Sequence, residues 1–181
     1  MKAQLSVLAL AIAGLVGCTN NRAPDVAANV RNSLRQAGLN DVTVSQDRDK
    51  GVVTLGGNVK QDADRARAEQ IAKPLAAGQV VADEIAVLPN GNESAAKTVN
   101  SDLDKGIESN LDAALVQANM KGIRHSTTNG VVTLKGDLET PARRSEAERV
   151  ATGVPNVQQV VNEITVKNQR ATSSSSADRS K

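Results

Sequence analysis

The chain has 181 residues, a mass of 18.8 kDa and a formal net charge of +2 at pH 7. It contains no Phe, Tyr or Trp, one His and one Cys. Without aromatic rings it offers no stacking platform for bases, no aromatic cage and no aromatic membrane belt. It has too few His and Cys ligands for a zinc site, and a Ser-His-Asp or Cys-His arrangement would have to use His125. We therefore expect no enzyme, no metal and no other cofactor.

The charge is unevenly distributed along the chain. Four of the last fifteen residues are Lys or Arg and one is Asp. Most of the positive excess thus lies in the tail, and the rest of the chain is nearly neutral. Nucleic-acid binding typically needs a strongly basic face, so we expect no nucleic-acid partner.

The first residues predict an export signal. Lys2 precedes an apolar run from Leu5 to Val16, which suits a signal peptide and is too short to span a bilayer. The run ends in Leu15-Val16-Gly17-Cys18, which resembles the bacterial lipobox, where the Cys is lipidated and the chain is cleaved just before it. We predict a signal peptide over 1–17, a lipidated Cys18 and a tether over 18–24. A plain secretory signal with an unrelated Cys is the alternative.

The chain contains an internal repeat. Residues 51–87 and 130–166 align without gaps at an offset of 79, and 16 of the 37 positions are identical, beginning with GVVTL in both. The similarity continues upstream at an offset of 81, where Val26, Val30 and Leu34 correspond to Ile107, Leu111 and Leu115. A duplicated unit is therefore expected.

Each copy predicts the order αββαβ. The first helix is indicated by apolar residues four apart, and in the second copy Thr140 and Pro141 suit the start of the second helix. Asn129-Gly130 predicts a tight hairpin, and Gly57 and Gly136 predict a bulge or a close backbone approach. The strands are expected at 42–45 and 123–126, 52–55 and 131–134, and through 81–87 and 161–166. The fold class is α+β, with two tandem units that each pack a three-stranded sheet on two helices.

The remaining segments complete the domain organisation. We expect the first unit over 25–88 and the second over 101–167. A Pro-Asn-Gly-Asn sequence indicates that 89–100 is a linker. The polar residues 168–181 are predicted to be a disordered tail.

The repeated pattern resembles the BON (bacterial OsmY and nodulation) domain family. The second copy carries it more completely, with GVVTL, Gly136, Gly153-Val154, Asn162 and Ile164; the first has Pro74-Leu75 and Asp83 at the corresponding positions. A lipobox followed by two such units resembles the dual-BON outer-membrane lipoproteins. The resemblance implies an αββαβ fold, a periplasmic location, attachment to phospholipid surfaces, and a role in outer-membrane integrity or osmotic stress. Thr19 after the Cys favours the outer membrane over inner-membrane retention.

Two functions remain open from the sequence. One is a lipid-anchored module that binds anionic phospholipid, and the other is a protein-interaction or chaperone-like module held at the envelope by its anchor. Without aromatic residues, lipid contact would be mainly electrostatic and salt-sensitive. The acidic residues Asp102, Asp104, Glu108 and Asp112 on the first helix of the second unit would oppose it. The candidate phospholipid contacts are Lys121, Arg124, Lys135, Arg143, Arg144 and Arg149.

Other singled-out residues have simpler interpretations. We interpret His125 as a partly exposed strand-end residue rather than a pH switch. Arg65-Glu69 and Arg144-Glu148 recur in both copies, and we interpret them as solvated helix pairs. Glu84 and Glu163 also recur, and we favour water over a capping role for both. Gly56-Gly57 lacks the rest of a phosphate-binding motif and is interpreted as a backbone bend.

Overall fold

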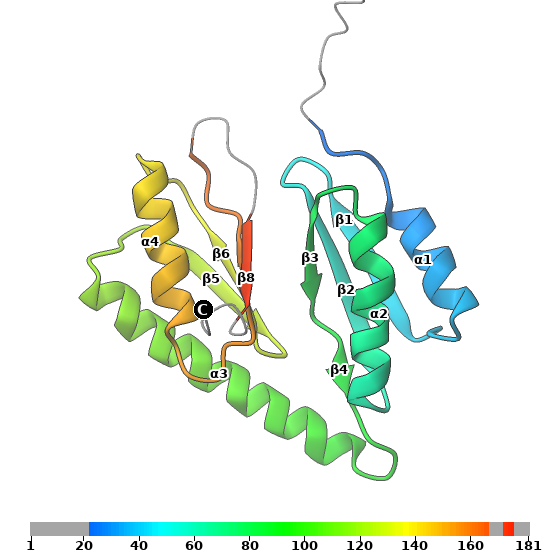
Figure 1. Ribbon diagram of the computed structural model, residues 1–181. Helices are drawn as coiled ribbons and strands as arrows, with labels where there is room; N and C mark the ends of the chain where they lie inside the picture. Colours follow the sequence, from blue (N-terminus) through cyan, green and yellow to red (C-terminus); the bar gives the residue numbers. More distant parts are fainter. Residues whose placement is uncertain (1–21, 167–171, 176–181) are drawn as a thin grey trace, which may run out of the picture.

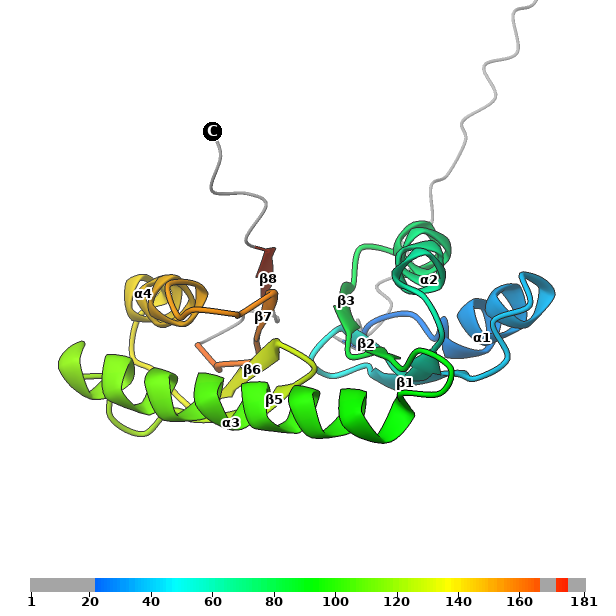
Figure 2. The ribbon, with the colours of Figure 1, turned by 90° about the horizontal axis from the view of Figure 1, so that it is seen from below.

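The structure is a computed structural model, and it describes residues 22–166 and the backbone of 172–175. The predicted signal peptide, Cys18 and the first part of the predicted tether lie outside the described residues. Two α+β units lie side by side, and one long helix runs beneath both (Figures 1 and 2). The predicted fold class and duplication are confirmed. None of the helices within the described residues combines the length and apolar character that a membrane span requires.

The first unit follows the predicted order. Strand β1 pairs antiparallel with β2, and β3 and β4 pair parallel with β2. The predicted last strand is thus divided in two. The elements are α1 (Ala27–Gln36), β1 (Val42–Asp47), β2 (Val52–Val59), α2 (Asp62–Leu75), β3 (Val80–Asp83) and β4 (Ala86–Val87).

The second unit repeats this arrangement. Strand β5 pairs antiparallel with β6, and β7 pairs parallel with β6. A fourth strand, β8, pairs antiparallel with β7. The elements are α3 (Glu93–Gln117), β5 (Arg124–Thr128), β6 (Val131–Lys135), α4 (Pro141–Thr152), β7 (Gln159–Asn162) and β8 (Thr172–Ser175).

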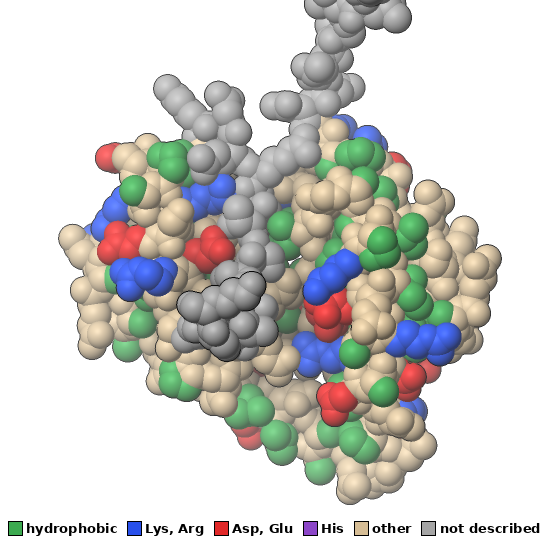
Figure 3. Space-filling view, in the orientation of Figure 1, with side chains coloured by type: hydrophobic (Ala, Val, Ile, Leu, Met, Phe, Trp, Pro, Cys, Tyr) green, Lys and Arg blue, Asp and Glu red, His purple; other side chains and the backbone are tan. Residues whose placement is uncertain are grey.

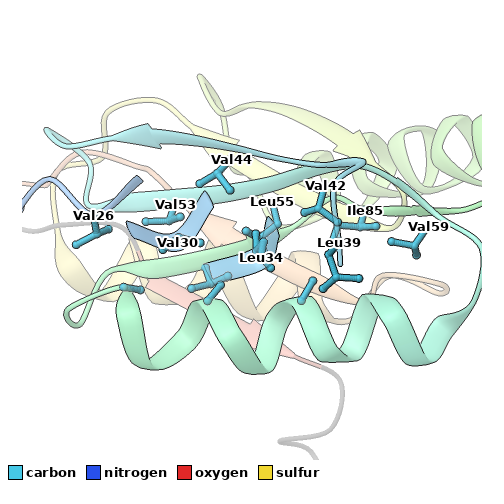
Figure 4. Packing of buried hydrophobic residues seen from close by; sticks show 14 residues of the cluster. Val26, Val30, Leu34, Leu39, Val42, Val44, Val53, Leu55, Val59 and Ile85 are labelled. Carbon is cyan, nitrogen blue, oxygen red and sulfur yellow. The ribbon is translucent and has the colours of Figure 1, made fainter. Parts of the chain in front are cut away.

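Aliphatic side chains build the core of each unit. Val53 and Leu55 in β2, and Val132 and Leu134 in β6, are all fully buried on the helix-covered side. Their spacing of two places both members of each pair on one face of the sheet, as predicted. Figure 4 shows how the labelled aliphatic residues of the first unit pack between the sheet and the helices.

The predicted turns have the expected backbone. Asn129 and Gly130 both have positive φ, at 49° and 79°, as the tight hairpin requires. Gly57 has φ 85°, and a Cβ placed there would lie 2.1 Å from the carbonyl oxygen of Asp41. A Cβ at Gly136 would lie 2.7 Å from the carbonyl oxygen of Gly122. The close backbone approach predicted at both glycines is therefore confirmed.

Helix α3 begins earlier than predicted. Residues 93–100, which we expected to belong to the linker, form its first turns. They contain no Gly or Pro and include Ala95 and Ala96, so the helix of the second unit can extend backward until Gly91, whose φ is 82°. The connection between the units is therefore short.

Both predicted terminal segments need correction. Residues 172–175, expected to be disordered, form β8, because β7 would otherwise leave the backbone groups of an edge strand unpaired. Residues 22–24, expected to belong to a tether, are bonded to the first unit. Ala23 is fully buried there.

The two units meet through equivalent apolar residues. Val52 and Ala82 of the first unit cluster with Val131 and Val161 of the second, and these pairs occupy the same positions in the repeat. Strands β2 and β6 are thus buried on both faces, one against helices and the other against the neighbouring unit.

Polar contacts between the units are also reciprocal. Lys50 Nζ lies 3.5 Å from the carbonyl oxygen of Glu163, and Asn129 Nδ2 donates to the carbonyl oxygen of Glu84 at 2.9 Å. Lys50 corresponds to Asn129 and Glu84 to Glu163 at the offset of 79. The interface is therefore approximately two-fold symmetric.

Candidate functional site: a basic end of the second unit

Most of the predicted lipid contacts lie at one end of the second unit. Lys121 is in the turn after α3, Arg124 begins β5 and Lys135 ends β6. All three side chains are exposed. Arg143 at the start of α4 donates to the carbonyl oxygen of Asn119 at 2.8 Å, which ties α4 to the same turn. We call these four cationic residues the basic end.

Two of these cations lie directly opposite each other. Arg124 and Lys135 are partners in the antiparallel β5–β6 register. Like charges in such a pair are destabilising. Lys135 is balanced in part by Glu163, with 3.6 Å between Nζ and Oε2. For Arg124 and Lys121 no ion pair is found among the described residues. Arg143 is paired with Glu146, with 3.3 Å between Nη1 and Oε2. The positive charge of this end that no ion pair among the described residues balances is therefore that of Lys121 and Arg124.

The basic end is specific to the second unit. The first unit has Asn40, Thr43, Gly56, Asp64 and Gln70 at the positions that correspond to Lys121, Arg124, Lys135, Arg143 and Arg149. None of these is basic. The shared fold therefore does not require the cations.

The other two predicted contacts lie elsewhere. Arg149 is exposed in the last turn of α4, away from the start of that helix. Arg144 is 5% exposed and donates to the carbonyl oxygen of Asn162 at 2.9 Å. Asn162 Nδ2 in turn donates to the Arg144 carbonyl oxygen and to Glu148 Oε2, both at 3.1 Å. Arg144 thus faces inward, where a lipid head group does not reach it.

The first unit has an equivalent buried contact between its second helix and its third strand. Arg65 Nε donates to Asp83 Oδ2 at 2.9 Å, and Arg65 Nη2 donates to the Asp83 carbonyl oxygen at 3.2 Å. Both side chains are largely buried. The interpretation of Arg65-Glu69 and Arg144-Glu148 as solvated helix pairs is wrong, because each Arg fastens its helix to the end of the third strand of its unit.

Burial shifts the pKa values of Asp83 and Arg144 in these contacts. It raises the pKa of Asp83, and the charge and hydrogen bond of Arg65 only partly oppose that shift. Burial lowers the pKa of Arg144, opposed by the charge on Glu148. The ordinary pKa of an arginine is so high that Arg144 stays charged at neutral pH.

The recurring glutamates face the unit interface rather than water. The Glu163 side chain is 12% exposed beside Lys135. Burial raises the pKa of Glu84, with Lys135 lowering it and Glu163 and Asp104 raising it. The prediction that Glu84 and Glu163 face water is therefore wrong. Their burial could not be predicted from the sequence of one unit, because the neighbouring unit covers them.

The acids of α3 bind the edge of the second sheet. Asp104 accepts the backbone N–H groups of Asn129 and Gly130 at 2.8 and 2.9 Å, and Glu108 accepts that of Thr127 at 3.0 Å. Because α3 begins at Glu93, these residues lie in mid-helix. Their carboxylates hold the sheet edge in place, and their negative charge still opposes contact of α3 with an anionic membrane.

His125 is more buried than predicted. Its side chain is 10% exposed, and Nε2 lies 2.9 Å from Asp112 Oδ1. It occupies the second position of β5, and its hydrogen bond with Asp112 joins this edge strand to α3. Within the described residues no group of three His, Cys, Asp or Glu side chains could hold a metal ion.

A groove of about 770 Å³ lies between the units. Its apolar lining includes Leu103, which is 45% exposed on α3, and Ile107. Asn100, Asn156 and Gln158 add amide groups. Such a mixture suits a polypeptide segment, and sequence reasoning missed the groove because residues of both units form it.

The chain is similar to known proteins over most of its length. A family model described as BON domain matches residues 23–89 and again 103–168. Osmotically-inducible protein Y of Escherichia coli (strain K12) is 30% identical over 132 residues, or 71% of this chain and 64% of that protein. The chain thus aligns with less than two thirds of the length of this relative.

Two solved structures of a Chlamydia trachomatis protein are also similar. One is the C-terminal domain of CdsD, the structural protein of the type III secretion system, at 14% identity and a TM-score of 0.32, covering 78% of this chain and 96% of that one. The other is CdsD again, at 13% identity and a TM-score of 0.35, covering 77% and 90%. Similarity at this level supports no conclusion about function.

Proposed function

Because the chain belongs to the BON-domain family, we propose that it is a non-enzymatic lipoprotein of the bacterial envelope whose second unit contacts anionic phospholipid. Lipidation of Cys18 places it on the periplasmic side of the outer membrane, where it supports membrane integrity or tolerance of osmotic stress. The name of the relative, osmotically-inducible protein Y, supports the second role.

One observation carries the lipid-contact part of the proposal. The basic end gathers cations on exposed turns and strand ends, including the opposed pair Arg124 and Lys135, at positions where the first unit has none. Opposed like charges reduce stability unless a ligand neutralises them. An anionic lipid surface supplies that neutralisation, and each basic residue near such a surface contributes about 1 kcal/mol.

Flotation with vesicles tests lipid contact without the anchor. A chain lacking residues 1–18 should float with vesicles rich in anionic lipid at low salt and dissociate as salt screens the interaction. Lys121→Glu with Arg124→Glu should weaken binding at least about tenfold, because two attractive charges become repulsive. The fold should survive, since Arg124→Glu places an acid opposite Lys135.

The matched control reverses two exposed cations of the first unit, Arg35→Glu with Arg67→Glu. It changes the net charge equally and should retain most of the binding. Equal losses in both variants would assign the effect to net charge rather than to the basic end. Absence of flotation at every salt concentration would discard lipid contact.

The groove between the units favours a second candidate function. Its apolar lining and amide groups suit an extended polypeptide, as a protein-interaction or chaperone-like module would require. In that case Leu103→Asp should abolish peptide binding and leave vesicle flotation unchanged. We rank this function second because the groove shows no preference for a particular peptide.

A further inference from the structure

The N-terminal strap, residues 22–24, is part of the first unit. Ala23 is fully buried, its N–H donates to the Arg48 carbonyl oxygen at 2.8 Å, and Arg48 Nε donates to the Ala23 carbonyl oxygen at 2.8 Å. The Pro24 carbonyl oxygen accepts from Gln46 Nε2 at 2.7 Å. The strap is therefore clamped to the turn between β1 and β2.

The clamp leaves little chain between the strap and the lipidation site. Residues 19–21 separate Cys18 from Arg22. Four peptide steps span at most about 14 Å. An acylated Cys18 at the membrane surface would therefore hold the β1–β2 turn close to the lipid head groups.

The β1–β2 turn lies against the second unit beside its basic end. Lys50 Nζ lies 3.3 Å from Thr165 Oγ1 and 3.5 Å from the carbonyl oxygen of Glu163, and Glu163 pairs with Lys135. Figure 1 shows the strap, the β1–β2 turn and the start of α4 at the top of the molecule, with the connection from β4 to α3 at the bottom. The approximate two-fold symmetry explains this, because it reverses one unit relative to the other.

This side carries charges of both signs. In the strap and the β1–β2 turn, Arg22, Arg48 and Lys50 are accompanied by Asp47 and Asp49, and Asp49 is paired with Arg22 at 2.7 Å. In the basic end, Arg143 Nη1 lies 3.3 Å from Glu146 Oε2. Asp47 Oδ1 accepts the N–H groups of Asp49 and Lys50 within the turn. Lys, Arg, Asp and Glu are likewise interspersed on the face that α2 and α4 form (Figure 3).

We propose that the clamped strap orients the whole molecule on the membrane. The strap, the β1–β2 turn and the basic end form one surface that faces the lipid head groups. This inference rests on the proposed anchor at Cys18. The anchor supplies attachment, and the clamp determines which side of the protein meets the lipid.

Site-specific fluorescence quenching in the full lipidated chain tests the orientation. Because Cys18 is the only native cysteine and acylation blocks its thiol, Lys50→Cys, Ala142→Cys and Asn90→Cys can each be labelled singly. The protein is placed in zwitterionic vesicles that carry a head-group quencher, so that anionic lipid contributes nothing. Labels at 50 and 142 should be quenched several-fold more strongly than the label at 90.

A linker variant separates the clamp from the anchor. A Gly/Ser insert of about twelve residues after Asn21 leaves Cys18 and the strap intact but releases the constraint. Quenching at 50 should then fall to the level at 90. Equal quenching at 50 and 90 without the insert, or unchanged quenching at 50 with it, would overturn the orientation.

The same experiment distinguishes failure of the anchor. If the full chain does not sediment with the vesicles, Cys18 is not an anchor, and both the proposed lipoprotein and the orientation are wrong. If it sediments but shows no difference between the labels, only the orientation is wrong. Lipid contact by the basic end is tested separately by flotation.

Discussion

At the scale of single residues, the two copies make the same contact between helix and strand with different side chains. In each unit an arginine of the second helix reaches the end of the third strand, where it meets Asp83 in one copy and Asn162 in the other. The side-chain oxygen of each also accepts the N–H of the isoleucine two residues later, at 3.3 and 3.2 Å. The amide provides this geometry without a buried negative charge.

We predict that Asp83→Asn stabilises the protein at neutral pH. Burial raises the pKa of Asp83, so the folded state favours the protonated form. The stabilising contribution of this group is present below the ordinary pKa of an aspartate and is lost as pH rises through the raised value. The advantage of Asp83→Asn in free energy of unfolding should therefore grow between about pH 4 and pH 7.

Denaturant unfolding at both pH values measures this difference. Asp62→Asn, which removes an exposed acid at the start of α2, the helix that carries Arg65, is the matched control. A variant Asp83→Asn that is less stable than the parent at neutral pH would mean that the ion pair with Arg65 outweighs the cost of burying the carboxylate.

The sequence could not assign these partners. The spacing of Arg65 from Glu69 is fully explained by a solvated pair on one helix, and nothing local indicates a partner eighteen residues away. The recurrence of the pair in both copies was the available signal. It showed that the arginine matters to the unit but not which atoms it contacts.

At the scale of elements, strand register follows from alternation and is tested by Leu134. This residue is fully buried in β6 against α3 and α4. Leu134→Ala removes core contacts and leaves a cavity, so the free energy of unfolding should fall by about 2–5 kcal/mol. Thr128→Ala on the exposed edge strand should change it by less than about 0.5 kcal/mol. An unchanged thermal transition for Leu134→Ala would refute the register.

Elements that depend on distant partners were harder to predict. The strands at Val53 and Val132 and the hairpin at Asn129 follow from local pattern. Strand β8 does not, because a run of serines pairs only when an unpaired strand edge is beside it. The backward extension of α3 likewise depends on a helix already nucleated in the second unit.

At the scale of the whole molecule, duplication was visible in the sequence but the two-fold arrangement was not. The reciprocal contacts of Lys50 and Asn129 join backbone carbonyls, which any residue supplies. This arrangement brings the clamped strap and the basic end to one side. The sequence separately predicts an anchor and a basic second unit, and the structure relates their positions.

The most direct test of the account concerns Cys18. Mass spectrometry of the mature protein, purified from the membrane fraction, should find a chain that begins at Cys18 and carries acyl chains there. Cys18→Ser should release the protein from that fraction. An unmodified Cys18, or a mature chain that begins at another residue, would contradict the lipoprotein on which the proposed function and orientation depend.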